Sequence, residues 1–181
     1  MIPFVLQPTL RSDVLALVPL SADDFDRLYA VASDPQIWEQ HPTKTRYQRD
    51  VFQNYFDGAI ASRGAFRVVH GKTDETIGCS RFYDFDEAER TVAVGYTFLA
   101  KKCWGTTYNR AMKSLMLDHA FLCVDRVVFH VGANNVRSRT AMERLGGVLV
   151  GERMVAYHGE KGTPNVIYEI EKEAWSRLRG F

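Results

Sequence analysis

The chain has 181 residues, of which 46% are hydrophobic and 25% are charged, and its formal net charge is +1. This length predicts one domain over residues 1–181 with one sizeable core. The small net charge excludes the global positive field that is typical of nucleic-acid binders, so a site for a polyanion would have to come from a local cluster.

The cysteines and the hydrophobic segments exclude further classes of protein. Cys79, Cys103 and Cys123 are widely spaced and form no Cys-x-x-Cys pair, so we expect neither a disulfide framework nor a bound metal. The N-terminus lacks the basic and apolar segments of a signal peptide, and no stretch reaches the ~20 apolar residues of a membrane span. We therefore expect a cytoplasmic protein with no membrane or nucleic-acid partner.

Apolar spacing in the first half of the chain predicts one strand, two helices and then three strands. The first strand covers residues 14–20, and the helices cover residues 21–33 and 48–62. Asp34-Pro35 ends the first of these helices. The three short strands are adjacent and form an antiparallel meander at residues 66–69, 76–83 and 91–99.

The second half of the chain alternates helices with strands. Its predicted elements are a helix at 106–123, a strand at 126–131, a helix at 138–144, hairpin strands at 148–157 and 165–170, and a helix from Lys172. In the long helix, Lys113 shares a polar face with Asn109 and Arg110. A helix between two strands of one sheet requires a crossover, so the sheet is mixed. We predict an α+β fold whose mixed, mostly antiparallel central sheet has about six to seven strands flanked by helices.

The most informative segment is Lys101 to Asn109, where a strand ends, a basic turn containing glycine follows, and a helix begins. The first turn of a helix has unpaired backbone N–H groups and a positive dipole end, which suit an anion. Gly105 allows a close approach of the backbone, and Thr106 or Thr107 adds a hydroxyl donor. A diphosphate fits this arrangement. An ordinary helix N-cap explains the same residues equally well.

A second strand-to-helix junction runs from Asn134 to Gly146. Asn135 or Ser138 can cap the following helix, and Arg137 and Arg139 can be solvated surface charges. By itself this junction is no more specific than the first.

Together the two junctions, in this order of elements, resemble the GNAT superfamily of N-acetyltransferases over nearly the whole chain. Residues 102–107, Lys-Cys-Trp-Gly-Thr-Thr, are similar to its diphosphate-binding motif, Gln/Arg-x-x-Gly-x-Gly/Ala. Lys102 stands where Gln or Arg is usual and keeps a positive charge. Thr107 stands where Gly or Ala is usual and crowds the backbone.

Further residues resemble the RimJ/RimL-like branch of that superfamily. They are Val94 to Leu99, then Trp104-Gly105-Thr106 and Asn109, and then Asn135, Ser138, Ala141 and Leu145-Gly146. The branch acetylates protein N-termini, and close relatives act on small amines. The resemblance therefore implies acetyl-CoA as co-substrate and a primary amine as acceptor.

The resemblance also implies a location for the cofactor. The strand 92–99 would diverge from its parallel neighbour, and the pantetheine arm would pair in that gap with the backbone of Phe98 and Leu99. A backbone N–H group there would face the thioester oxygen. The implied cofactor-binding residues are Phe98, Leu99, Lys102, Trp104, Gly105, Thr106, Thr107, Asn109, Asn135 and Ser138.

The resemblance implies less about proton transfer. Ser138 would lie near the sulfur and protonate the departing thiolate, although it can also be a helix cap. Tyr157 and His158 are candidate proton acceptors by position, since the histidine has a suitable unperturbed pKa of ~6.5. A chain of water molecules with no single base is an alternative. We interpret His70, His119 and His130 as structural residues.

The acceptor pocket and the oligomeric state are predicted only coarsely. Trp38 and Tyr83 are candidates to line the acceptor pocket, and each can instead be an aromatic residue of the core or of the rim. A homodimer is compatible with the resemblance, with a contact around an exposed Trp175 and Phe181.

Two functional classes remain open at this point. The first is an acetyl-CoA-dependent N-acetyltransferase that acts directly on a protein N-terminus or a small amine. The second is a non-catalytic acyl-CoA-binding sensor or interaction module, which the Thr107 departure and the absence of an obvious base both leave open.

Overall fold

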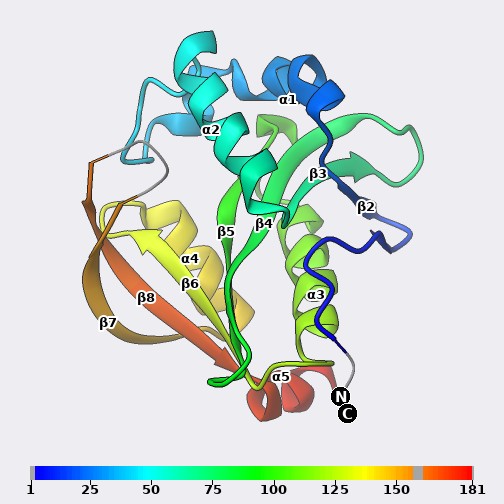
Figure 1. Ribbon diagram of the computed structural model, residues 1–181, viewed down its shortest axis with the longest axis vertical. Coiled ribbons are helices and arrows are strands. Elements are labelled where there is room, and N and C mark those ends of the chain that lie inside the picture. Colours follow the sequence, from blue (N-terminus) through cyan, green and yellow to red (C-terminus); the bar gives the residue numbers. More distant parts are fainter. Residues whose placement is uncertain (1–2, 157–160, 181) are drawn as a thin grey trace.

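Eight strands form a single sheet in the order β1-β2-β3-β4-β5-β6-β8-β7 in the computed structural model (Figure 1), which describes residues 3–156 and 161–180. The strands are β1 (Leu10–Arg11), β2 (Leu15–Pro19), β3 (Ala65–His70), β4 (Thr76–Asp86), β5 (Thr91–Leu99), β6 (Arg126–Gly132), β7 (Val148–Val155) and β8 (Thr163–Glu171). The predicted mixed, mostly antiparallel sheet is confirmed. The strand number is eight rather than six to seven, because β1 is too short to show an alternating pattern.

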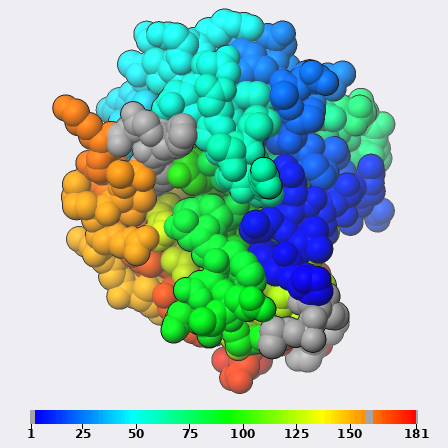
Figure 2. Space-filling view, in the orientation of Figure 1, coloured from blue at the N-terminus to red at the C-terminus, as the bar shows by residue number. Residues whose placement is uncertain are grey.

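Within the described residues, five helices flank the sheet. The space-filling view in Figure 2 shows residues 49–62 (cyan) near the top of the face that it displays. They are α1 (Phe25–Ala32), α2 (Arg49–Ser62), α3 (Tyr108–Ala120), α4 (Val136–Leu145) and α5 (Lys172–Arg179). The first predicted helix begins as a 3-10 turn, η1 (Ala22–Asp24), and becomes α-helical at Phe25. The long helix starts two residues later than expected, after the turn η3 (Lys101–Cys103) and Gly105.

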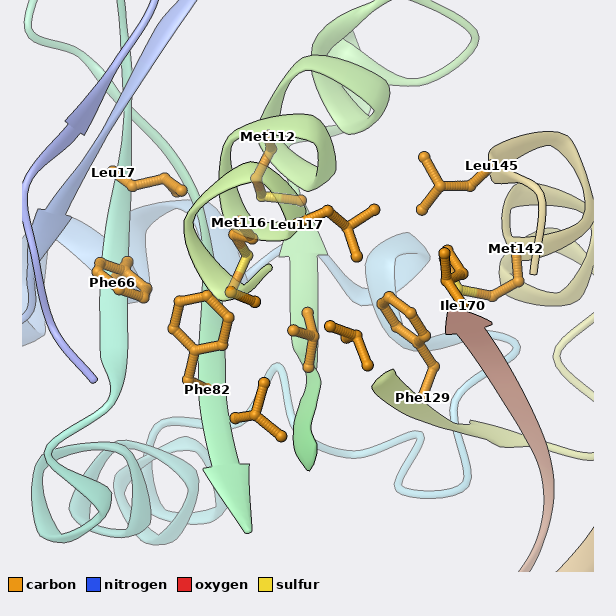
Figure 3. Packing of buried hydrophobic residues seen from close by; sticks show 14 of the residues in the cluster. Leu17, Phe66, Phe82, Met112, Met116, Leu117, Phe129, Met142, Leu145 and Ile170 are labelled. Carbon is orange, nitrogen blue, oxygen red and sulfur yellow. The ribbon is translucent and has the colours of Figure 1, made fainter. Parts of the chain in front are cut away.

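The main hydrophobic core lies between the sheet and the helices α3 and α4 (Figure 3). From α3 it takes Met112, Met116 and Leu117, all with 0% exposure. The spacing of these residues places them on one face of the helix. Figure 3 shows them against strand residues that include Leu17, Phe66, Phe82, Phe129 and Ile170.

A second cluster joins α1, α2 and the turn η2 (Pro35–Trp38) to strand residues that include Ala65 and Phe98. The two clusters therefore cover the two faces of the sheet. We call these the α2 face and the α3 face.

Trp175 corrects one prediction. Its side chain is only 6% exposed and belongs to the main core, and its indole Nε1 donates to Asp118 Oδ1 at 2.7 Å. The predicted exposed contact around this residue is therefore wrong, because an amphipathic helix buries its one large aromatic side chain. Phe181 lies outside the described residues.

Among the strands that the structure describes, only β5 and β6 pair in parallel, and this pairing is short. It consists of Thr91↔Arg126, Val92↔Val127 and Ala93↔Val128. Beyond Ala93 the two strands are no longer paired, so the expected divergence of β5 from β6 is present. We call the opening between them the fork. No helix within residues 3–156 and 161–180 is long and apolar enough to cross a lipid bilayer.

Candidate functional site

A cavity of about 590 Å³ occupies the fork and extends along the start of α3 and α4. This volume is within the range of ~300–1,000 Å³ that is usual for small-molecule sites. The cavity brings together nearly all predicted cofactor residues and one predicted acceptor residue: Trp38, Phe98, Leu99, Trp104, Gly105, Thr106, Thr107, Asn109, Asn135 and Ser138.

The turn before α3 forms one end of the cavity. Gly105 has a φ of +69°, in the left-handed region that favours glycine, and a Cβ there would meet nothing within 4 Å. The Thr106 hydroxyl donates to the Cys103 carbonyl oxygen at 2.6 Å and accepts from the Tyr108 N–H at 3.4 Å. This hydroxyl holds the turn together, while the exposed Thr107 side chain lines the cavity.

The side chain of Lys102 points away from the cavity. Its ammonium group lies 2.5 Å from Glu75 Oε1, in an exposed ion pair, and the residue is not among those that line the cavity. The adjacent ring of Trp104 lies at the cavity, and its Nε1 donates to the Leu99 carbonyl oxygen at 3.0 Å.

At the second junction, the same residues form the cap of α4 and line the cavity. Asn135 Oδ1 accepts from the Ser138 N–H at 3.1 Å, which caps α4, and both residues line the cavity. Asn135 is 8% exposed. Its carboxamide nitrogen remains a donor that can face a ligand.

The described residues that line the cavity include no aspartate or glutamate. Their charged members are Arg110, Lys113, Arg137 and Arg144. Arg137 lies over the Trp104 ring at 3.9 Å and donates to the Ile37 carbonyl oxygen at 3.0 Å. A local cationic cavity in a chain of nearly zero net charge is the arrangement that a polyanionic ligand requires.

Lys113 lies at the fork on the α3 face and is only 3% exposed. Its ammonium group donates to Thr97 Oγ1 at 2.7 Å and to Ser80 Oγ at 3.3 Å. Burial lowers the pKa of this lysine from 10.5 to about 7. At this residue the predicted polar face of α3 is buried. The sequence signal for this burial is the position of Lys113 beside Met112 and one turn before Met116.

The strand β5 bends at the fork. Tyr96 has a φ of +51°, which is uncommon for a residue with a side chain. The Tyr55 hydroxyl donates to its carbonyl oxygen at 2.5 Å, and the Arg81 guanidinium lies 3.8 Å from the centre of its ring. The contacts from α2 and β4 thus hold the bent backbone in place.

The residues predicted to line the pocket for the acceptor amine lie on the α2 face. Trp38 is 2% exposed, lines the cavity and donates from Nε1 to the Ala32 carbonyl oxygen at 2.7 Å. Tyr83 does not line the cavity, but its hydroxyl lies 2.9 Å from Nδ1 of His130, which does.

The predicted proton acceptors Tyr157 and His158 lie outside the described residues. Among residues that the structure describes, no three His, Cys, Asp or Glu side chains are grouped as metal ligands.

Comparisons with known proteins agree with this geometry. Residues 15–148 match the family model described as "Acetyltransferase (GNAT) domain", whereas no curated protein matches significantly. A GCN5-related N-acetyltransferase from Brucella melitensis has a similar structure, with a TM-score of 0.84 and 20% identity over 98% of this chain and 85% of that chain.

Two liganded structures are also similar in fold. Mycobacterium smegmatis RimJ, in complex with CoA-disulfide, has a TM-score of 0.71 and 19% identity over 96% of this chain and 92% of that chain. The spermidine N-acetyltransferase of Vibrio cholerae, in complex with CoA and spermine, has a TM-score of 0.66 and 17% identity over 91% and 99% of the two chains. With the family match over residues 15–148, we conclude that the chain belongs to the GNAT family of acetyltransferases.

Proposed function

We propose that this GNAT acetyltransferase transfers an acetyl group from acetyl-CoA directly to a primary amine, either a protein N-terminus or a small amine. The observation that supports this most is the cationic cavity that fills the fork between β5 and β6. An unpaired strand edge beside a cationic helix start can hold both the amide-containing arm and the phosphates of CoA.

In this proposal, the turn at Gly105 and the first N–H groups of α3 bind the diphosphate, together with the side chains of Thr107 and Asn109. Arg110 and Arg144 supply further positive charge at the cavity. The ion pair of Lys102 with Glu75 directs that ammonium group away from the cavity. We therefore assign Lys102 only a contribution to the local electrostatic potential.

The backbone of Phe98 and Leu99 would hold the pantetheine arm on the open edge of β5, and Asn135 would donate to an amide carbonyl of that arm. Acetyl-CoA would supply an activated acetyl thioester at the fork. Backbone N–H groups near the bend at Tyr96 would face this position and stabilise an oxyanion. Bringing the two substrates together in the correct orientation is worth up to ~7–11 kcal/mol of the barrier.

Ser138 would donate a proton to the departing thiolate. Its place in the first turn of α4, beside Asn135 and at the cavity, supports this role. Trp38, on the α2 face of the sheet, would border the acceptor.

The test is a screen of amine acceptors with release of free thiol as the readout. We expect transfer to at least one amine, and Ser138→Ala should lower kcat by roughly tenfold or more with little change in the Kd for CoA. Tight CoA binding without transfer to any amine would favour an acyl-CoA sensor. Failure to bind any CoA ester would contradict the proposal.

A further inference from the structure

His130 and Tyr83 form a hydrogen-bonded pair on the α2 face of the sheet, with the tyrosine hydroxyl 2.9 Å from His130 Nδ1. Phe129, the preceding residue of β6, belongs to the main core on the α3 face. Because successive side chains of a strand point to opposite faces, His130 projects from the α2 face. The pair therefore lies on the side of the sheet opposite to Lys113.

The imidazole is at the point where the fork opens. The last residue pair between β5 and β6 is Ala93↔Val128, and His130 follows two residues later and lines the cavity. Gly95 leaves room for the tyrosine, since a Cβ at this glycine would come within 3.1 Å of the Tyr83 ring. The absence of a side chain in β5 thus lets a residue of β4 reach across to β6.

We propose that His130 is the general base that accepts the proton of the acceptor amine, and that Tyr83 is a positioning residue that fixes the imidazole. This inference rests on the proposed acetyl transfer. The amine nitrogen forms a C–N bond with the acetyl carbon, the C–S bond breaks, and its electron pair goes to sulfur. The amine proton moves to His130 Nε2, and the thiolate is protonated by Ser138 or solvent.

The hydrogen bond at Nδ1 leaves Nε2 for the acceptor. When Nδ1–H donates to the Tyr83 oxygen, the lone pair of the imidazole is on Nε2, which is the tautomer that a base requires. The described part of the chain gives Nε2 no hydrogen-bond partner.

The surroundings of His130 favour its neutral form. Burial lowers its pKa below 6.5, Arg153 of β7 lowers it further, and Asp84 of β4 raises it. Arg126 and Glu169, on the same face of β6 and β8, contact each other at 3.7 Å. A neutral imidazole at pH 7 can accept a proton directly.

The other histidine at the cavity is a much weaker candidate. His41 Nδ1 accepts from the Thr43 N–H at 3.0 Å, and its Nε2 lies 3.1 Å from Arg46 Nη1. Burial, together with the charge of Arg46, lowers the pKa of His41 to about 3. No carboxylate of the described residues lines the cavity, so His130 has no acidic competitor there.

The test measures kcat/KM, calculated for the neutral form of the amine, against pH for the wild type and for five variants, with an amine that the acceptor screen identifies. In the wild type, the rate should fall below the pKa of His130. His130→Gln should lose this acid limb and lower kcat by roughly 100-fold or more, with an unchanged Kd for CoA. Tyr83→Phe should lower kcat by about tenfold and keep the acid limb.

The matched control is His119→Gln. His119 is on α3, bonds the Val5 carbonyl oxygen at 2.8 Å and does not line the cavity, so its variant should match the wild type. An unchanged kcat and acid limb in His130→Gln would overturn the inference. The inference would also be overturned if Lys113→Met or His158→Gln lost the acid limb while His130→Gln kept it. If the wild type transfers acetyl to no amine, the proposed function fails instead.

Discussion

Replacing Lys113 with Met should remove the pH dependence that a buried ammonium group imposes on stability. In the folded protein this lysine is 3% exposed, and its ammonium group donates to the hydroxyls of Thr97 and Ser80. Methionine has a similar length and no charge, and it matches the neighbouring Met112 and Met116. The substitution therefore removes the charge from the main core while it keeps most of the packing.

The magnitude follows from the pKa of Lys113. Its lowering from 10.5 to about 7, at ~1.36 kcal/mol for each pH unit, amounts to roughly 5 kcal/mol. Between pH 7 and 10.5 the unfolded chain binds more protons than the folded chain, so the free energy of unfolding rises with pH. Below pH 7 both states are protonated, and the full cost of burying the charge remains.

The assay is urea denaturation of the ligand-free protein at a series of pH values from 6.5 to 9.5. We expect the wild type to gain stability over this range relative to Lys113→Met, and the variant to be the more stable protein at pH 6.5. Lys72→Met, at an exposed position in the β3–β4 turn, serves as the control and should follow the wild type. Parallel profiles for the wild type and Lys113→Met would refute the reasoning.

Two glycines give further predictions. Gly105→Asp should weaken CoA binding by at least tenfold in calorimetry, because a carboxylate would repel the diphosphate. Gly105→Asn should weaken binding much less, since asparagine tolerates the same positive φ and has no charge. Equal losses in the two variants would show that charge is not the cause. Gly78→Ala would place a Cβ 2.2 Å from the Phe98 carbonyl oxygen, so it should lower the free energy of unfolding by about 2 kcal/mol or more. Gly151→Ala meets nothing within 4 Å and should be neutral, and a neutral Gly78→Ala would mean that β5 yields easily.

Much of the fold and the residues at one end of the cavity could be predicted because local sequence signals determine them. The basic turn with Gly105 and the cap formed by Asn135 and Ser138 are short segments, and the structure places both at one cavity. The direction of a flexible side chain is not a local property. Lys102 contacts Glu75, which is 27 residues away in the chain, and no spacing near the motif indicates this.

The residues on either side of the fork could not be predicted for the same reason. Lys113 is buried because β4 and β5 present hydroxyl groups to it, and Tyr83 reaches His130, which is 47 residues away, across a glycine. Such contacts depend on the register of three strands. From the sequence alone, His130 resembles a structural residue of a β-branched strand.

The shortness of the β5–β6 pairing has a mechanical consequence. The sheet consists of two blocks of strands, β1 to β5 and β6, β8 and β7. Only the three residue pairs between β5 and β6 join these blocks within the described sheet. A ligand that pairs with the open edge would act as an additional strand segment and would connect the blocks. Amide hydrogens of β5 that face the fork should then exchange fast in the free protein and slowly with CoA bound, and thermal unfolding should become more cooperative.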